Sequence, residues 1–103
     1  MKRFDICPAR GTGVRGRERL VIILQHEHLS DLATTVVAPL YSVRELPALN
    51  GLRPILTLGR KKFVIAIDRL VSIPKSQLAT SVGSAEPIRF ELLRAVDRLF
   101  SGF

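Results

Sequence analysis

Residues 54–67 read PILTLGRKKFVIAI, and this stretch decides the fold class. Two apolar runs rich in β-branched residues, 54–58 and 62–67, flank the polar tripeptide Gly59-Arg60-Lys61. Strand-forming runs joined by a short turn that contains glycine are typical of a β-hairpin. The stretch therefore predicts two antiparallel strands.

Short strand patterns continue on both sides of this hairpin. Residues 20–24 are an unbroken apolar run, which predicts a central strand buried on both faces. Residues 4–7, 34–38 and 71–74 predict further strands, and we expect Pro39 to stop or bulge the third of the chain's strands. Between the third strand and the hairpin, Asn50 and Gly51 predict a reversal of the chain. Repeated short strands with polar turns predict a small antiparallel barrel or sandwich.

The last part of the chain changes to a helical pattern. Ser84 is suited to cap a helix, Glu86 favours the helix dipole, and Pro87 is tolerated only in a first turn. From Ile88 to about Phe100, apolar residues recur at helical spacing with charged residues opposite them. We expect an amphipathic helix that covers the sheet, and hence an α+β fold that is mainly β.

Length and charge limit the function. The chain has 103 residues, enough for a single domain, residues 1–103, with one modest core. Its 16 Lys and Arg against 9 Asp and Glu give a net charge of +7. Most of these cations are arginines, whose planar guanidinium suits phosphates and carboxylates. The charge favours an anionic partner, either nucleic acid or an acidic protein segment, and net charge does not separate these two.

The chain carries no pattern for export or membrane insertion. Its apolar runs fall short of the ~20 residues of a membrane-spanning helix. Residues 1–5 contain two cations and an acid without the apolar core of a signal peptide. Cys7 has no internal disulfide partner and is read as a small buried hydrophobe. We expect a cytoplasmic protein.

Residues 9–19 read ARGTGVRGRER and predict a cationic loop. The glycines lead into a strand and lack the Gly-Lys-Ser/Thr ending of a phosphate-binding loop, so that interpretation fails. Its arginines either bind a polyanion or are simply solvated. They are Arg10, Arg15, Arg17 and Arg19.

No catalytic or metal-binding constellation stands out. His26 and His28 flank Glu27, but no third ligand of suitable spacing follows, so we predict no metal site. Paired carboxylates and a Ser-His-Asp arrangement are also missing from the sequence pattern. We therefore expect a protein without enzymatic activity and without a cofactor.

Four segments resemble, in order and spacing, those of the CcdB toxins of toxin–antitoxin modules. They are RLV at 19–21, VAPL at 37–40, PILTLG at 54–59 and DRLVSIP at 68–74. The resemblance covers nearly the whole chain. It implies an SH3-like barrel with a C-terminal helix that forms a homodimer. It also implies a toxin that binds the dimerisation region of the DNA gyrase A subunit, contacts nucleic acid only indirectly, and is neutralised by a small acidic antitoxin.

The resemblance places gyrase binding in the C-terminal tail. The family typically ends in Trp-Gly-Ile, where this chain has Ser101, Gly102 and Phe103. Gly102 matches and Phe103 keeps an apolar end, but Ser101 lacks the aromatic face and N–H donor of tryptophan. We expect weak or no poisoning of an ordinary enterobacterial-type gyrase, or else a different gyrase or a different target. Phe100 and Phe103 either project toward a partner or fold back onto the barrel.

Two other functions stay open. By resemblance the barrel is shared with the MazF/Kid endoribonuclease toxins, and cations and bases for such chemistry are present in the chain. The third possibility is a barrel that only binds nucleic acid or its antitoxin, using the loop arginines and residues 60–62. For the favoured function, a gyrase-binding toxin, a net charge of +7 predicts an acidic, largely disordered antitoxin. The ribonuclease candidates are Arg17, Arg19, His26, Asp68 and Arg69.

Overall fold

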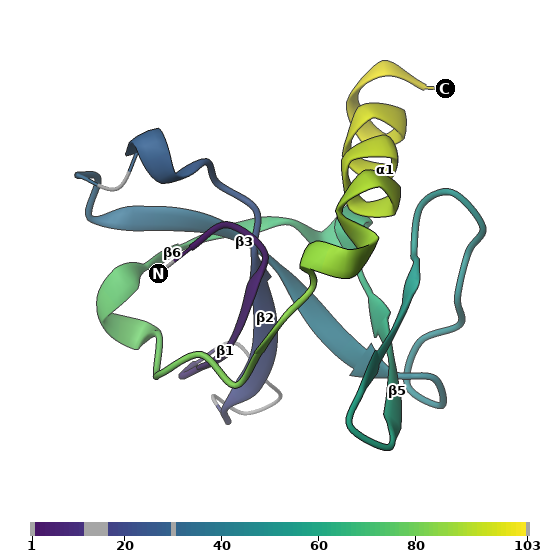
Figure 1. The fold of residues 1–103 in the computed structure, drawn as a ribbon, viewed down its shortest axis with the longest axis horizontal. Coiled ribbons are helices and arrows are strands. Elements are labelled where there is room, and N and C mark those ends of the chain that lie inside the picture. Colours follow the sequence, from purple (N-terminus) through teal and green to yellow (C-terminus); the bar gives the residue numbers. More distant parts are fainter. Residues whose placement is uncertain (1, 12–16, 30, 103) are drawn as a thin grey trace.

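The computed structural model describes residues 2–11, 17–29 and 31–102. This part of the chain forms a β-barrel that is nearly closed, with one α-helix after it (Figure 1). The strands are β1 (Asp5–Ala9), β2 (Arg19–Ile23), β3 (Thr34–Ser42), β4 (Ile55–Leu58), β5 (Lys61–Ile65), β6 (Val71–Pro74) and β7 (Gly83–Ser84), and the helix is α1 (Arg89–Ser101). The expected SH3-like antiparallel barrel with a C-terminal helix is confirmed.

The strands pair antiparallel in the order β4-β5-β3-β2-β1-β7, and β6 pairs with β3. The hairpin predicted from residues 54–67 is present as β4 and β5, with Leu58 opposite Lys61 and a two-residue turn between them. The Asn-Gly reversal lies in a turn that is closed by a bridge between Leu49 and Arg53. The hairpin and the Asn-Gly turn were predicted correctly because each is closed by residues that are close together in the sequence.

β3 is longer than its sequence pattern indicated. We expected Pro39 to stop or bulge this strand, but β3 runs through Pro39 to Ser42. The first half of β3 pairs with β6 up to Val37, and its second half pairs with β5 from Leu40. Pro39, which has no N–H, lies between these two partners, and its carbonyl accepts a 3.0 Å hydrogen bond from the Ala66 N–H.

The barrel closes where its two end strands meet. A Cβ atom on Gly83 of β7 would lie 2.9 Å from Leu58 Cδ1 of β4 and 3.6 Å from Ile6 Cδ1. Glycine at this position therefore lets the end strands approach each other without a hydrogen-bonded ladder between them.

The entry into β1 is held in an unusual conformation. Phe4 is buried and has a φ of 72°, in the left-handed region that non-glycine residues rarely adopt. Its N–H donates to the Ile23 carbonyl at 2.6 Å, and its carbonyl accepts from the Ala85 N–H at 2.8 Å. Phe4 thus ties the start of the chain to β2 and to the segment that leads into α1.

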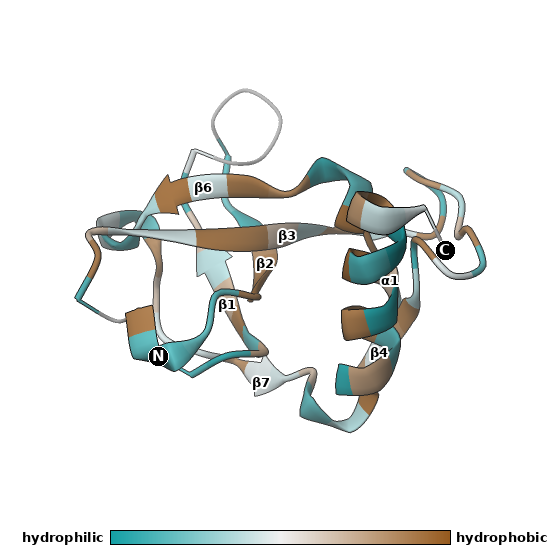
Figure 2. Ribbon diagram, turned by 90° about the horizontal axis from the view of Figure 1, so that it is seen from above, coloured by the Kyte–Doolittle hydropathy of each residue, from teal (hydrophilic) through white to brown (hydrophobic). Residues whose placement is uncertain are grey.

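Helix α1 covers the main core. Leu92 and Ala95 are fully buried against barrel residues that include Ile22 and Ile67. Figure 2 shows apolar and hydrophilic bands alternating along α1, as expected of an amphipathic helix. No helix in the described ranges is long and apolar enough to cross a membrane.

The start of α1 differs from expectation. Ser84 does not cap it; Ser84 belongs to β7, and its Oγ accepts a 3.1 Å hydrogen bond from the Glu86 N–H. Residues 86–88 form a 3₁₀ turn that contains Pro87, and α1 begins only at Arg89. Ser84 therefore stabilises the short turn before the helix.

A second, smaller core confirms the interpretation of Cys7. The Cys7 side chain is completely buried and packs with Val21, Val37 and Ile73. Burial raises the pKa of the Cys7 thiol above its usual range. β1 continues past Cys7 through Pro8 to Ala9, so this cysteine lies within the strand.

An ion pair joins the loop before β4 to the 3₁₀ turn after β5. Arg53 Nε and Nη2 donate to the two carboxylate oxygens of Asp68 at 3.0 and 2.7 Å, and Arg53 Nη1 also donates to the Pro47 carbonyl at 3.4 Å. The hydrogen bonds from Arg53 lower the pKa of Asp68. This pair anchors the loop against the turn on which α1 packs.

The Arg53–Asp68 pair predicts a pH-dependent stability. Because the folded state lowers the pKa of Asp68, its contribution is complete above the unfolded value of about 3.9 and disappears as the pH falls through the lowered pKa. We expect Asp68→Asn to reduce the free energy of unfolding at pH 7, and the difference from wild type to shrink below pH 4. Urea unfolding across this pH range measures it, with Asp31→Asn at an exposed position as the control. An Asp68→Asn deficit that stayed constant down to pH 2 would contradict this role.

Candidate functional site

The end of α1 presents an aromatic ring to solvent. Phe100 is 74% exposed, and Ser101 and Gly102 are also exposed. Phe103 lies outside the described residues. For Phe100, the sequence left open whether the ring projects or folds back, and in the structure it projects. Figure 1 shows this end of the helix pointing away from the barrel.

Gly102 gives the helix a defined end. Its φ is 82°, the left-handed conformation that glycine adopts easily, and its N–H donates to the Arg98 carbonyl at 2.9 Å. A side chain at this position would be strained, since L-residues disfavour this φ. Gly102 therefore fixes the direction in which the chain leaves α1. We call Phe100, Ser101 and Gly102 the exposed tail.

Two arginines meet on one tyrosine ring at the other candidate site. The guanidinium carbon of Arg19 lies 4.1 Å from the centre of the Tyr41 ring, and that of Arg69 lies 5.0 Å from it. Both distances are typical of cation–π contacts. We call Arg19, Tyr41 and Arg69 the arginine–tyrosine cluster.

Arg19 is fixed in this cluster by further contacts. Its Nη1 donates to the Leu40 carbonyl at 2.8 Å, and its Nη2 lies 3.3 Å from a carboxylate oxygen of Glu45. The Ser42 N–H donates to Glu45 at 2.9 Å; this bond, and next the one from Arg19, lowers the pKa of the Glu45 carboxyl. Arg19 is thus held in place rather than solvated.

A hollow adjoins the cluster. It has a volume of about 420 Å³, and Tyr41, Arg69, Ser72 and Gln77 are among its lining residues. Apolar residues such as Val21 and Ile73 form much of the remaining lining. The hollow thus offers an aromatic face, a guanidinium and hydrogen-bonding groups along part of its wall.

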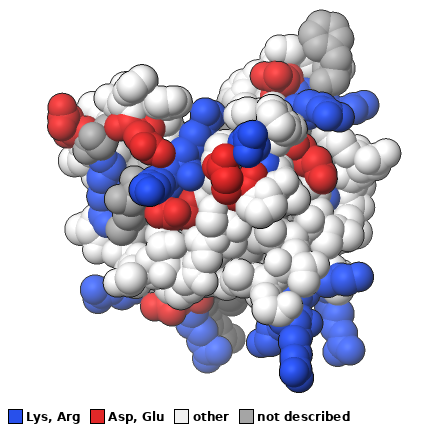
Figure 3. Space-filling model, in the orientation of Figure 1, with Lys and Arg blue, Asp and Glu red and all other residues white. Residues whose placement is uncertain are grey.

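The predicted anion-binding arginines are distributed unevenly. Arg10 and Arg17 are exposed, and the Arg10 N–H donates to the Gln77 carbonyl at 3.0 Å. Arg15 lies outside the described residues. Arg19 belongs to the arginine–tyrosine cluster. Lys and Arg side chains also gather along the edge where the β4–β5 hairpin turns (Figure 3). Residues 60–62, which end this turn and begin β5, are exposed.

The structure separates the five ribonuclease candidates. Arg19 and Arg69 come together, whereas Asp68 is engaged by Arg53. His26 lies in a different part of the barrel, where its ring is 4.3 Å from that of His28 and its Nδ1 accepts from the His28 N–H. Arg17 is exposed ahead of β2. Within residues 2–11, 17–29 and 31–102, no group of three or more His, Cys, Asp and Glu side chains could hold a metal ion.

Sequence reasoning missed Tyr41. The β2–β3 register pairs Val21 with Pro39, which sets Arg19 against Tyr41 two residues further along. Extending the expected third strand past Pro39 would have placed Tyr41 beside the arginine that opens β2. Because we expected the strand to stop or bulge at Pro39, the position of Tyr41 beside Arg19 was not predicted.

Comparison with solved structures supports the fold. A mycobacterial endoribonuclease solved in complex with its cognate antitoxin superposes with a TM-score of 0.79 at 10% identity, covering 97% of this chain and 94% of that one. An Mtb toxin gives a TM-score of 0.71 at 21% identity, with 90% and 99% covered. The Mycobacterium tuberculosis toxin MazF-mt6 gives 0.68 at 24% identity, with 93% and 95% covered.

Comparison with sequences identifies the family. No curated protein matches the chain. The family model described as CcdB protein matches residues 3–102, nearly the whole chain. The chain therefore belongs to the CcdB family of toxins.

Proposed function

We propose that this toxin acts by binding the dimerisation region of the DNA gyrase A subunit through its exposed tail, without chemistry of its own. The exposure of Phe100 at the end of a helix anchored by Leu92 carries the proposal. Interfaces are often anchored by aromatic rings, and Phe100 presents such a ring at the end of the chain where the family resemblance places gyrase binding. Family membership supplies the target class, and the toxin would act as a cytoplasmic homodimer.

An acidic antitoxin is the proposed neutralising partner. The net charge of +7 and the exposed Arg10 and Arg17 favour a negatively charged, extended segment. A structure with the same fold is an endoribonuclease in complex with its cognate antitoxin, which supports a partner of this kind.

The test is induced expression with and without the acidic reading frame that we expect next to this gene, followed by a gyrase cleavage assay. We expect growth arrest relieved by the antitoxin, together with accumulation of cleaved DNA bound to the gyrase of the organism that carries this toxin. With an ordinary enterobacterial-type gyrase we expect weak or no accumulation. Toxicity without trapped cleavage complexes would reject the gyrase mechanism while leaving a toxin.

The arginine–tyrosine cluster favours a second candidate function, RNA cleavage. The Arg69 guanidinium lines the hollow, and Arg19 lies on the same tyrosine ring, so the cluster could stabilise the charge on a phosphate during transesterification. Such a reaction also needs a general base. Asp68 is already bonded to Arg53, and His26 lies elsewhere, so neither of these candidates supplies a base at the cluster.

We therefore expect purified protein to leave RNA intact. Incubation with a labelled RNA in the presence of a chelator, analysed on a denaturing gel, measures this. Arg69→Gln removes a cation of the cluster, and Arg60→Gln removes one from the hairpin turn as a matched control. Cleavage that disappears in Arg69→Gln and persists in Arg60→Gln would establish the second function instead of the first.

A further inference from the structure

The end of the β4–β5 hairpin carries three consecutive cations. Arg60, Lys61 and Lys62 follow one another in the sequence, and all three are exposed. A Cβ atom added to Gly59 would meet no described atom within 4 Å, so the tip of the hairpin stands in open space. We call residues 57–62 the cationic hairpin end.

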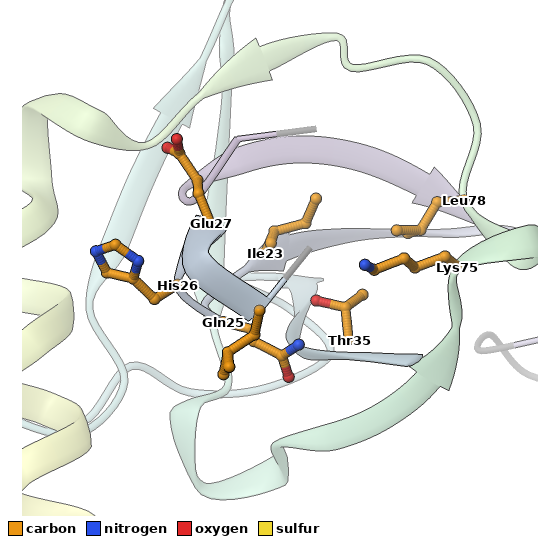
Figure 4. A pocket seen from close by; sticks show the side chains of 8 residues that line it. Ile23, Gln25, His26, Glu27, Thr35, Lys75 and Leu78 are labelled. Atoms are coloured by element: carbon orange, nitrogen blue, oxygen red, sulfur yellow. The ribbon is translucent and has the colours of Figure 1, made fainter. Parts of the chain in front are cut away.

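The charges of the hairpin end are not neutralised within the described part of the chain. The ion pairs of that part join Arg19, Arg53 and Arg89 to acids, and none includes a cation of the hairpin end. Elsewhere opposite charges share one space, as in the pocket that Glu27 and Lys75 both line (Figure 4). Figure 3 shows Lys and Arg side chains projecting from the edge where the hairpin turns, with no Asp or Glu among them on this face. The hairpin end therefore presents positive charge alone.

Strand geometry places the two lysines on opposite faces of the hairpin. Successive side chains of a strand point to opposite faces. The register pairs Leu58 with Lys61 and Thr57 with Lys62. Lys61 thus belongs to one face of the two-stranded ribbon and Lys62 to the other, while Arg60 lies in the turn at the tip. A ligand that encloses the ribbon meets a cation on each face and another at the tip.

The major groove of duplex DNA has the shape that such a ribbon requires. It is about 12 Å wide, lies between two phosphate backbones and admits a two-stranded β-ribbon. The strands of a ribbon lie only about 4.8 Å apart, so there is room for a lysine side chain on each face. The corresponding groove of duplex RNA is deep and narrow, which disfavours the same insertion. The shape of the ribbon therefore favours DNA over RNA.

An acidic peptide fits the hairpin end less well. Extended peptides gain affinity from apolar anchors that fill pockets, in addition to their charge. No residue of 57–62 lines the pocket of Figure 4 or the hollow beside the arginine–tyrosine cluster. A convex, cationic tip instead suits contacts to a row of phosphates, which need charge and hydrogen-bond donors.

We propose that the cationic hairpin end binds duplex DNA directly by entering the major groove, with Lys61 and Lys62 on the phosphates of opposite walls. The family resemblance implies only indirect contact with nucleic acid, and its nearest segment, 54–59, ends just before these cations. The inference does not rest on the proposed function. Figure 1 shows the hairpin turn and the end of α1 at opposite ends of the molecule, so a single chain can hold DNA at one end and a protein at the other.

The first experiment measures how DNA binding depends on salt. A short fluorescent DNA duplex of mixed sequence is titrated with the full chain, and anisotropy gives the association constant at several salt concentrations. Each phosphate contact contributes about −0.9 to the slope of the logarithm of this constant against the logarithm of salt concentration. We expect Lys61→Gln and Lys62→Gln each to flatten the slope by about 0.9, and the double variant by about 1.8.

Lys2→Gln is the matched control. It removes the same charge from an exposed lysine next to the N-terminus, which Figure 1 places away from the hairpin turn. Its slope should equal that of the wild type. Equal flattening in Lys2→Gln and in the hairpin variants would show that DNA responds to net charge alone, and would overturn the inference. A wild-type chain that leaves the duplex unbound would also overturn it.

The second experiment distinguishes DNA from other polyanions. The same titrations use an RNA duplex of the same sequence and a polyglutamate. We expect both to bind more weakly than DNA and to respond equally to the wild type and to the Lys61→Gln/Lys62→Gln double variant. If either loses as much affinity as DNA in the double variant, the hairpin end is a general polyanion site and the inference fails.

Folding and gyrase trapping are checked separately. The substituted lysines are exposed, so the melting temperatures of the variants should stay close to that of the wild type. Phe100→Ala should bind the DNA duplex as the wild type does, because the tail lies at the other end of the molecule. A chain that binds DNA through the lysines but traps no gyrase keeps this inference and loses the proposed target. A chain that traps gyrase but shows no lysine-dependent DNA binding loses this inference alone.

Discussion

Phe100→Ala is expected to trap gyrase at least tenfold less efficiently than the wild-type chain. A buried aromatic anchor at an interface contributes about 2 kcal/mol or more, which corresponds to more than an order of magnitude in affinity. Because Phe100 is 74% exposed in the isolated chain, its removal should leave the stability of the fold almost unchanged. The amount of cleaved DNA as a function of toxin concentration is the measurement.

The same helix offers a matched control. Phe90 is 62% exposed at the opposite end of α1, so Phe90→Ala removes an equivalent ring far from the tail. It should trap gyrase as well as the wild type does. Ser101→Trp restores the family's aromatic residue and should increase trapping. Equal loss in both phenylalanine variants, or none in Phe100→Ala, would remove the tail from the mechanism.

Leu92→Ala is expected to destabilise the chain by about 2–5 kcal/mol, the usual cost of truncating a buried leucine. Leu92 is completely buried between α1 and the barrel, where its loss leaves a cavity in the main core. For a domain of this size, each 1 kcal/mol lowers the melting temperature by roughly 4–8 °C. Thermal and denaturant unfolding measure the effect.

Leu92→Met conserves most of the volume and should cost less than about 1.5 kcal/mol. If α1 holds the tail in position, the Leu92→Ala variant should trap less gyrase near its melting temperature. Trapping should recover when the sample is cooled. An Ala variant as stable as the Met variant would mean that α1 is not anchored through Leu92.

The sequence predicted elements whose signals are local. The β4–β5 hairpin and α1 follow from the alternation and helical spacing of neighbouring residues. The ends of elements depended on distant partners: Pro39 is tolerated within β3 because β6 ends and β5 begins beside it. Ser84 bonds to a 3₁₀ turn because Pro87 delays the helix.

The candidate sites were predictable only in part, for the same reason. The exposure of Phe100 could not be predicted, since its position on the helix borders the buried face formed by Leu92 and Ala95. The arginine–tyrosine cluster joins three segments far apart in the chain, and only the strand register brings them together.

The hydrogen bond from the Ala85 N–H to the Phe4 carbonyl joins two residues that are far apart in the chain. β1 can pair with β2 soon after both emerge from the ribosome, but the Phe4 carbonyl finds its donor only once residue 85 has been synthesised. Closing so long a loop late is characteristic of slow, non-local folding. Before that contact forms, the barrel on which α1 packs is incomplete, so a nascent chain does not yet hold the exposed tail in its final position.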